Sequence, residues 1–217
     1  RLTIQPPHPT FPREGGRLTR RTIRHSNSVY VPPMRIIAGQ FKGRKLFTPE
    51  DTSIRPTSDR TRESIFNLLM HGAYGGDNIV GCHVLDLCCG TGALGLEALS
   101  RGARIVTFVD KLKPSIELAK KNAMHCGVTQ QSFFIQGDAA NLPTVREAVD
   151  LVLMDAPYAT PLLAPAYASL VRGGWLAPNA LIVAEQERAA AVPTLDGAEL
   201  IDERQYGKPK VLIYRVS

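Results

Sequence analysis

Short runs of apolar residues alternate with segments of helical periodicity along most of this 217-residue chain. The runs are short enough to be buried strands, and most are followed by residues with helical spacing. Such strand-then-helix units place successive strands parallel to one another, with helices covering both faces of the sheet. We therefore expect an α/β fold with a mostly parallel sheet. The predicted strands are residues 83–87, 105–110, 133–135, 151–154 and 181–184.

The helices of this scheme have recognisable ends. Thr57 and Ser58 can cap the first helix. Pro114 suits the first turn of another. The tail is expected to close the sheet with a pair of strands, the last at residues 211–214. The predicted helices span residues 57–69, 114–127 and 162–171, and a further one opens at residues 94–99.

The composition excludes several other classes of protein. Hydrophobic residues make up 44% and charged residues 21%, which is typical of globular domains. No apolar run approaches the ~18 residues of a membrane span. Four cysteines in a chain of this length do not form a disulfide framework, so we expect a reduced, cytoplasmic compartment. His71, His83 and Cys126 lack the spacing of metal ligands, and we predict no metal.

Most of the positive charge lies at the start of the chain. Residues 1–33 carry a net charge of +5 out of a total of +6, together with six prolines and few periodic apolar residues. Such a segment buries too little surface to offset the entropy of ordering. We predict a disordered basic arm or an upstream extension, with Met34 as the natural start. The alternative is an arm that touches phosphates.

Residues 34–56 are predicted to form a separate N-terminal extension, and residues 57–217 the main domain. Gly39 and Gly43 divide the first part of this extension into short extended segments, a pattern typical of a β-hairpin. Four cations surround Phe41 in this hairpin. Both a solvated face and a phosphate-binding surface would explain them. The cations are Arg35, Lys42, Arg44 and Lys45.

A glycine-rich turn follows the first predicted strand. Gly90, Gly92 and Gly95 fit the fingerprint G-x-G-x-x-G, and Asp110 stands where such sites bind a ribose. Asp86, four residues before the turn, would repel the pyrophosphate of a nicotinamide cofactor. The same carboxylate would attract S-adenosylmethionine, which carries a sulfonium and an ammonium group. The sequence therefore favours S-adenosylmethionine, bound at the carboxyl ends of the strands.

The stretch from Leu85 to Ala103 resembles the first motif of class I S-adenosylmethionine-dependent methyltransferases. More narrowly, the chain resembles the bacterial RsmD family, which methylates N2 of a guanine in small-subunit (16S) ribosomal RNA. The resemblance begins at Met34 and implies a Rossmann-like, seven-stranded sheet with an N-terminal β-hairpin. The stretch Arg-Pro-Thr-Ser-Asp-Arg at residues 55–60 makes it more specific. The matching stretches are residues 34–46, 55–63, 85–103 and 206–214.

The resemblance also implies a role for individual residues. Asp86 and the backbone around Gly90 and Gly92 would hold the methionine part of the cofactor, Asp110 the ribose and Asp138 the adenine amine. The remaining cofactor-binding residues that it implies are Cys88, Thr91 and Ala139. The RNA-binding residues are expected to be Arg35, Lys42, Arg44, Lys45 and Arg60.

The tetrapeptide Asp155-Ala156-Pro157-Tyr158 would form the target-base site. The Asp155 carboxylate and the Ala156 carbonyl can accept both N–H bonds of an exocyclic amine and aim its lone pair at the methyl group. Tyr158 would stack on a base that has left its helix. Family members usually have two prolines in this motif, and Ala156 replaces the first.

Other functions remain open from the sequence. The tetrapeptide also fits an adenine-N6 methyltransferase on DNA or RNA, or an enzyme that methylates a glutamine amide in a protein. A catalytically impaired protein that binds cofactor and RNA is a further alternative. The basic hairpin favours nucleic acid as the partner. We expect a monomer that acts on ribosomal RNA within a small-subunit assembly particle, and no membrane partner.

Overall fold

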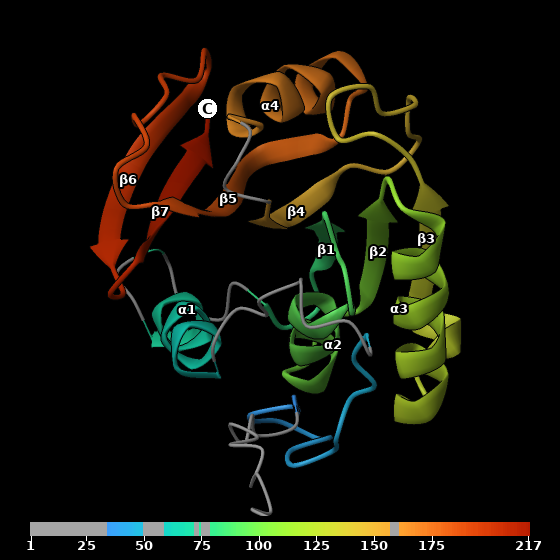
Figure 1. The fold of residues 1–217 in the computed structure, drawn as a ribbon. Helices are drawn as coiled ribbons and strands as arrows, with labels where there is room; N and C mark the ends of the chain where they lie inside the picture. The colour runs from blue at the N-terminus through green and yellow to red at the C-terminus, as the bar shows by residue number, and fades with distance from the viewer. Residues whose placement is uncertain (1–33, 50–58, 72–73, 75–78, 157–160) are drawn as a thin grey trace, which may run out of the picture. The chain divides into compact units, whose positions relative to one another are not determined.

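The computed structural model describes residues 34–49, 59–71, 74, 79–156 and 161–217, all within one compact unit. Seven strands form one sheet in the order β3-β2-β1-β4-β5-β7-β6 (Figure 1). The first five pair in parallel, and β7 runs antiparallel between β5 and β6. The predicted α/β fold is confirmed. The strands are β1 His83–Leu87, β2 Ile105–Asp110, β3 Ser132–Gln136, β4 Val149–Asp155, β5 Leu176–Glu187, β6 Ala198–Gln205 and β7 Pro209–Val216.

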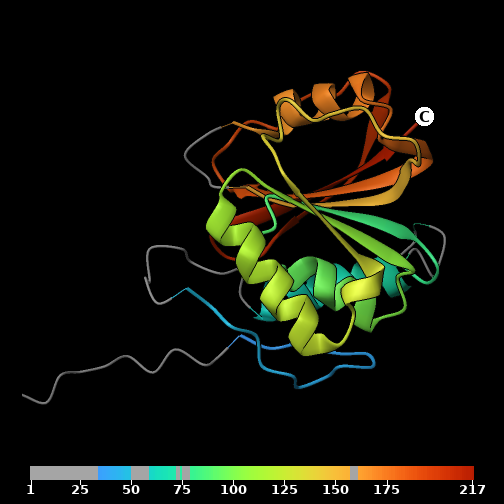
Figure 2. The same ribbon diagram turned by 90° about the vertical axis from the view of Figure 1, so that its right-hand side faces the viewer.

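Helices cover both faces of the sheet, as the alternating pattern predicts. Three of them lie against one face and α4 lies against the other (Figure 2). A short 3-10 helix, Thr129–Gln131, precedes β3. The capping residues proposed for the first helix, Thr57 and Ser58, lie outside the described residues. The helices are α1 Asp59–His71, α2 Ala93–Ser100, α3 Lys113–Cys126 and α4 Leu163–Arg172.

Each face of the sheet has its own hydrophobic core. Phe66 of α1, Leu96 of α2 and Phe108 of β2 belong to one core, and Trp175 and Tyr214 belong to the other. Side chains alternate between the faces of a strand, so the central strands are apolar at nearly every position. All five residues of β1 are buried. This double burial explains why the sequence shows continuous apolar runs.

The third glycine of the turn has a packing role. A Cβ atom at Gly95 would lie 2.4 Å from the ring of Phe108 and 2.7 Å from a methyl group of Val106. Both contacts are too short for a real side chain, so any larger residue would push α2 away from β2. Gly95 therefore sets the close approach of this helix to the sheet.

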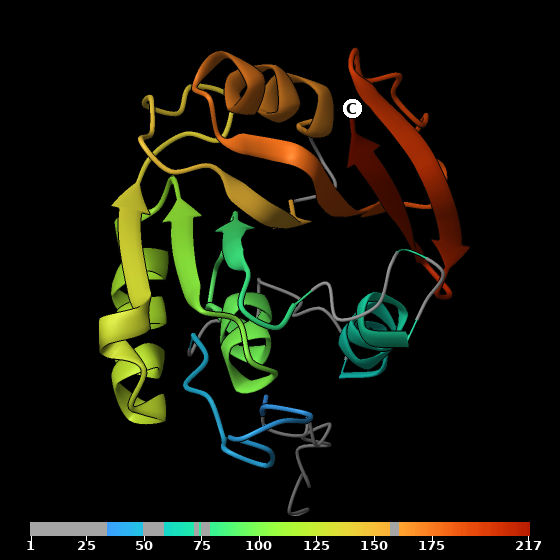
Figure 3. The same ribbon diagram turned by 180° about the vertical axis from the view of Figure 1, so that it is seen from behind.

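The strand order changes direction between β1 and β4. The helix after β1 leads to β2 on one side, whereas β4 pairs with β1 on the other side. The arrowheads of β1, β2 and β3 point to the same edge (Figure 3). Ligands of open α/β sheets bind at this carboxyl edge, in the crevice where the order switches. The predicted site residues Asp86, Asp110 and Asp155 all belong to strands that end there.

The fifth strand is longer than its apolar run. It begins at Leu176, five residues before the predicted start, and a register irregularity lies in its pairing with β4 between Val149 and Leu151. Asn179 in this part has a φ of 63°, outside the extended range. Pro178 and Asn179 interrupt the apolar pattern, which explains why only residues 181–184 were expected as strand.

The segment before α1 is folded back on itself. Arg35 and Lys45 form an isolated antiparallel bridge, and Ile36 and Leu46 donate backbone hydrogen bonds to Arg44 and Met34. No strand is assigned within residues 34–49. The β-hairpin therefore stays a prediction. Among the helices that the structure describes, none combines the length and apolar character needed to cross a membrane.

Candidate active site

The turn between β1 and α2 adopts an unusual backbone. Cys88 and Gly90 have φ values of 64° and 52°, in the left-handed region that side chains disfavour. A Cβ atom built on Gly90 would meet no other atom within 4 Å. Glycine at this position therefore serves the backbone conformation rather than packing, and it leaves room for a ligand to approach the turn. The backbone of the turn is thus suited to holding part of a cofactor.

Asp86 lies inside the protein beneath this turn. Its side chain is 1% exposed, and its Oδ2 accepts a hydrogen bond from the Gly95 N–H at 2.8 Å. Burial raises the pKa of Asp86 to about 8, and the nearby carboxylates of Asp155 and Asp110 add to the shift. A positively charged ligand would favour the ionised form, whereas a pyrophosphate would oppose it. The site therefore fits S-adenosylmethionine better than a dinucleotide.

Asp110 connects the end of β2 with the glycine turn. Its two carboxylate oxygens accept backbone N–H bonds from Gly90 and Leu112, each at 2.9 Å. The carboxylate thereby fixes both the turn and the start of the segment that leads into α3. Asp110 is half-buried at the carboxyl end of its strand. Its predicted ribose-binding role stays a prediction, and its position beside the turn is compatible with it.

Asp138 lies just beyond the end of β3 in a more open environment. It pairs with Lys111 at 2.9 Å and accepts the Ala140 N–H at 3.0 Å. The hydrogen bond from Lys111 lowers the pKa of this carboxyl group. Asp138 is therefore ionised near neutral pH and able to accept a hydrogen bond from an amine. Ala139 next to it is buried.

The hydroxyl and carbonyl groups of Thr91 already form hydrogen bonds within the protein. Its hydroxyl group donates a hydrogen bond to the sulfur of Met34 at 3.2 Å, and its carbonyl accepts one from Asn122. Its side chain is 9% exposed. A cofactor contact at this position would therefore involve the backbone N–H rather than the hydroxyl group.

β4 ends at Asp155, and the next residue, Ala156, lines a cavity. The cavity has a volume of about 380 Å³ and lies between the end of β4, the end of β5 and the start of α4. Pro157 and Tyr158 of the predicted tetrapeptide lie outside the described residues. The apolar part of the lining includes Met154, Ala156, Pro161, Leu162, Ala184 and Pro193. A cavity of this size at the strand ends can receive a nucleotide base.

The adjacent cysteines are not poised as nucleophiles. Burial raises the pKa of Cys88 to about 12 and raises that of Cys89 as well. The carboxylates of Asp86 and Asp110 shift both in the same direction. Both thiols stay protonated at neutral pH, and only a thiolate is strongly nucleophilic. Within the described ranges, no group of three or more His, Cys, Asp or Glu residues could hold a metal ion.

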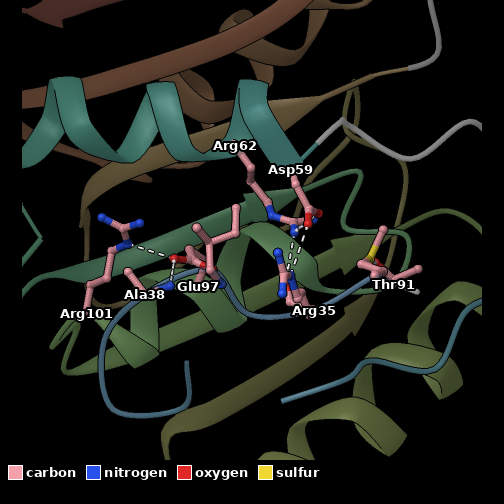
Figure 4. A network of polar contacts seen from close by, with 9 residues as sticks. Arg35, Ala38, Asp59, Arg62, Thr91, Glu97 and Arg101 are labelled. Atoms are coloured by element: carbon pink, nitrogen blue, oxygen red, sulfur yellow. Dashed lines mark hydrogen bonds and ion pairs between the residues drawn. The ribbon is translucent and has the colours of Figure 1, made fainter. Parts of the chain in front are cut away.

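Sequence reasoning missed Glu97 of α2. This residue is fully buried and accepts backbone N–H bonds from Ile37 at 2.7 Å and Ala38 at 3.0 Å (Figure 4). Arg101, one turn later, donates to the same carboxylate at 2.8 Å. Glu97 therefore fixes segment 34–49 to the main sheet domain. A single acid within the otherwise apolar helix 93–100 is the signal that could have revealed it.

Other contacts secure the same segment. Ser100 Oγ donates to the Ala38 carbonyl at 2.6 Å and accepts the Phe41 N–H at 2.9 Å. A Cβ atom at Gly39 would lie 1.9 Å from the Ser100 carbonyl oxygen, so glycine is required for this approach. Arg62 of α1 donates to the carbonyl of Arg35 at 2.7 Å. The backbone of the segment is thus held against both α1 and α2.

The cations predicted to bind RNA all lie on the surface. Arg44 donates to the carbonyl of His125 at 3.1 Å and lies 5.3 Å from the centre of the Phe41 ring. Lys121 of α3, which was not predicted, lies 4.0 Å from the centre of the Phe47 ring. The five predicted RNA-binding residues, all exposed, are Arg35, Lys42, Arg44, Lys45 and Arg60. The basic surface thus continues from segment 34–49 onto α3.

This seven-stranded sheet, with its left-handed glycine turn and buried acid at the carboxyl edge, is that of an S-adenosylmethionine-dependent methyltransferase of the Rossmann-like class. Comparison with known proteins identifies the family within this class of methyltransferases. The family model described as conserved hypothetical protein 95 matches residues 34–215. A ribosomal RNA small subunit methyltransferase D of Haemophilus influenzae is 35% identical over 186 residues, which cover 84% of this chain and 93% of the relative.

A curated sequence and a solved structure from Escherichia coli give the same result. The ribosomal RNA small subunit methyltransferase D of strain K12 is 36% identical over 179 residues, covering 79% of this chain and 82% of that protein. The solved structure of the yhhF protein has a TM-score of 0.71 and 33% identity, covering 85% of this chain and 98% of that one. The chain belongs to the RsmD family of methyltransferases.

Proposed function

We propose that this protein transfers a methyl group from S-adenosylmethionine to the exocyclic N2 amine of a guanine in small-subunit ribosomal RNA. The observation that carries the proposal is the group of carboxylates at one edge of the sheet. Asp86, Asp110 and Asp155 lie close enough for the latter two to raise the pKa of Asp86. The relatives named as small-subunit ribosomal RNA methyltransferases support the choice of RNA.

The cofactor would bind across the carboxyl ends of β1, β2 and β3. Asp86 and the backbone of the glycine turn would hold its methionine part, Asp110 the ribose hydroxyl groups and Asp138 the adenine amine. Bound there, S-adenosylmethionine supplies a methyl group on a cationic sulfur. The buried carboxylate of Asp86, ionised in the complex, would stabilise this cation.

The amine of guanine is a weak nucleophile because its lone pair is delocalised into the ring. Asp155 and the Ala156 carbonyl would each accept one of its N–H bonds and orient the lone pair toward the methyl carbon. The new N–C bond forms as the C–S bond breaks, and the nitrogen then loses a proton, which Asp155 can accept. The motif would be completed by Pro157 and Tyr158. Ala156 retains the carbonyl group that a proline would supply.

The RNA would contact the basic surface around segment 34–49. Its cations lie on a backbone that Glu97 and Ser100 hold in place. We propose that the segment acts as an N-terminal β-hairpin that binds phosphates, and that the substrate is an assembling small subunit in the cytoplasm. The enzyme would act as a monomer.

Transfer of radiolabelled methyl groups tests this function. The purified protein is incubated with labelled S-adenosylmethionine and with undermethylated small subunits, total RNA, DNA or protein extract in parallel. Label in small-subunit RNA, recovered after digestion as N2-methylguanosine, is the expected result. Label recovered as N6-methyladenine or in protein would contradict the proposal and identify a different methyltransferase activity. Cofactor binding without transfer to any acceptor would show that the enzyme is catalytically impaired.

A further inference from the structure

Asn122 of α3 contacts both the glycine turn and segment 34–49, and its side chain is fully buried. Its Oδ1 accepts the N–H of Phe47 at 2.8 Å, and its Nδ2 donates to the carbonyl of Phe47 at 3.0 Å. The same nitrogen donates to the carbonyl of Thr91, in the glycine turn, at 2.9 Å. One amide group therefore links the turn to the segment.

The three partners fix the orientation of this amide. If the amide were turned over, its nitrogen would face the N–H of Phe47 and its oxygen would face the carbonyl groups of Phe47 and Thr91. All three hydrogen bonds of Asn122 would be lost, and the cost would be high because the group is buried. The carbonyl of Thr91 and the backbone of Phe47 are therefore held at fixed positions relative to each other.

The first residue of the segment contacts the same turn. The hydroxyl group of Thr91 donates to the sulfur of Met34 at 3.2 Å, and the carbonyl of Met34 accepts the N–H of Leu46 at 2.9 Å. The two ends of the segment are thus paired with each other, and both are bonded to Thr91 or to its partner Asn122. A change in the position of Thr91 would therefore act on both ends.

Phe47 also belongs to the basic surface proposed to bind RNA. The residue is 40% exposed, and the centre of its ring lies 4.0 Å from the ammonium group of Lys121. The ring of His125 packs against it edge-on, with 5.2 Å between the two ring centres. The backbone of Phe47 is thus linked to the proposed cofactor turn, while its side chain lies on the surface proposed for RNA.

The backbone around Thr91 is one that a cofactor can order. Thr91 lies between Gly90 and Gly92, whose φ values are 52° and 78°. Glycine has access to more backbone conformations than other residues. A cofactor on the turn would restrict these conformations, and Asn122 would extend the restriction to Phe47. A second ligand that needs the same element ordered then binds more tightly, because less conformational entropy is lost.

We propose that Asn122 is a positioning residue that couples cofactor binding on the glycine turn to RNA binding on segment 34–49. This inference rests on the proposed function. Cofactor and RNA should each raise the affinity for the other by the same factor, because such coupling is reciprocal. The enzyme with bound cofactor would therefore hold RNA more tightly than the free enzyme does.

Sinefungin makes the coupling measurable without methyl transfer. This analogue carries an amine in place of the sulfonium methyl group, so it keeps a positive charge but cannot react. The affinity of dye-labelled protein for undermethylated small subunits is measured by fluorescence anisotropy, with and without saturating sinefungin. The ratio of the two dissociation constants is the coupling factor. It should be at least about 5 in the wild type and below about 2 in Asn122→Ala.

Ser100→Ala is the matched control. Ser100 also holds the segment by two hydrogen bonds, but it lies at the end of α2 that is farther from the glycine turn. This variant should weaken RNA binding equally with and without sinefungin and keep the wild-type coupling factor. If Asn122→Ala behaves in the same way, its role is purely structural and the inference is wrong. Thermal melting shows whether each variant is folded.

Hydrogen exchange in the wild type tests the same link without a substitution. Sinefungin alone should slow the exchange of the Phe47 N–H, which Asn122 accepts, severalfold. The Phe41 N–H, which Ser100 accepts, should exchange at an unchanged rate. Both rates are measured by NMR. A Phe47 N–H that exchanges equally fast with and without sinefungin would overturn the inference, even if Asn122→Ala does not fold.

The outcomes separate the inference from the function on which it rests. If the wild type forms N2-methylguanosine but sinefungin leaves its affinity for small subunits unchanged, the inference is wrong and the proposed function stands. If the wild type forms no N2-methylguanosine, both are wrong. A coupling factor that is lost in Asn122→Ala and kept in Ser100→Ala establishes the link.

Discussion

The carboxyl edge of the sheet and segment 34–49 carry charge in opposite ways. At the edge, burial raises the pKa of Asp86, and its neighbours Asp155 and Asp110 raise it further. In segment 34–49 the cations face solvent, and the buried charge that holds the backbone, Glu97, belongs to another element. Buried charges interact strongly and specifically, whereas exposed charges are screened and act in sum. Chemistry is thus expected to depend on single residues at the edge, and RNA affinity on many weak contacts.

The largest effect is expected at Asp155. Asp155→Ala removes the acceptor that would orient the amine, so the rate of methyl transfer should fall by about 10³-fold, within the range for positioned catalytic groups. Cofactor affinity measured by calorimetry should remain near the wild-type value. Asp196→Ala, in an exposed loop, is the control. A variant at Asp155 that keeps its rate would remove this residue from the base site.

Substitution of Glu97 tests whether a single buried charge also holds segment 34–49 in place. Glu97→Ala leaves Arg101 and the N–H groups of Ile37 and Ala38 without their acceptor. Removing one partner of a buried ion pair costs about 3–5 kcal/mol in the free energy of unfolding. Urea denaturation measures the change. Glu117→Ala, which breaks an exposed pair with Lys120, should cost less than about 1 kcal/mol. Equal effects of the two variants would contradict the anchoring role.

The pKa of Asp86 predicts how cofactor binding depends on pH. The group is mainly protonated below pH 8 in the free protein, and a cationic cofactor favours its ionised form. Binding should therefore release protons, and affinity should rise by up to about tenfold per pH unit up to pH 8. Calorimetry in buffers of different ionisation enthalpy counts the protons. Asp86→Asn should release none from this group, and an unchanged proton count would refute the assignment.

The same shift affects stability without cofactor. Because the pKa of Asp86 is higher in the folded than in the unfolded state, its contribution to stability is full below pH 4 and declines as pH rises through 8. Asp86→Asn should remove this part of the decline, which is measured by thermal melting of the free protein across that range. A steeper decline in the variant than in the wild type would have the wrong sign.

The smallest effect is expected from a single exposed cation. Lys45→Glu should weaken RNA binding severalfold at low salt and reduce the slope of log affinity against log salt by about 0.7–0.9 for each lost phosphate contact. Lys208→Glu makes the same charge change in the turn between β6 and β7 and should leave the slope unaltered. Identical slopes for both variants and the wild type would place RNA elsewhere.

Much of the fold follows from local sequence patterns. The apolar runs and the helix periodicity predict the five parallel strands and the helices between them, because strands buried on both faces leave an unmistakable pattern. The start of β5 does not follow, since Pro178 and Asn179 break the pattern and only pairing with β4 extends the strand. That information lies in contacts between residues distant in the sequence.

The residues of the candidate site also fall into those that the sequence predicts and those that it does not. Asp86, Asp110 and Asp155 could be predicted because each is the last or second-last residue of a recognisable strand. Glu97 could not be assigned a role, since its role depends on the docking of segment 34–49. An acid in an apolar run marks such positions but does not identify the partner.

A crystal structure with S-adenosylhomocysteine and a guanine-containing RNA fragment tests the central claim most directly. The account predicts the cofactor product on the glycine turn, its ribose at Asp110, and the guanine amine between Asp155 and the cofactor sulfur. A cofactor product bound away from the turn, or a base whose amine points away from Asp155, would contradict it.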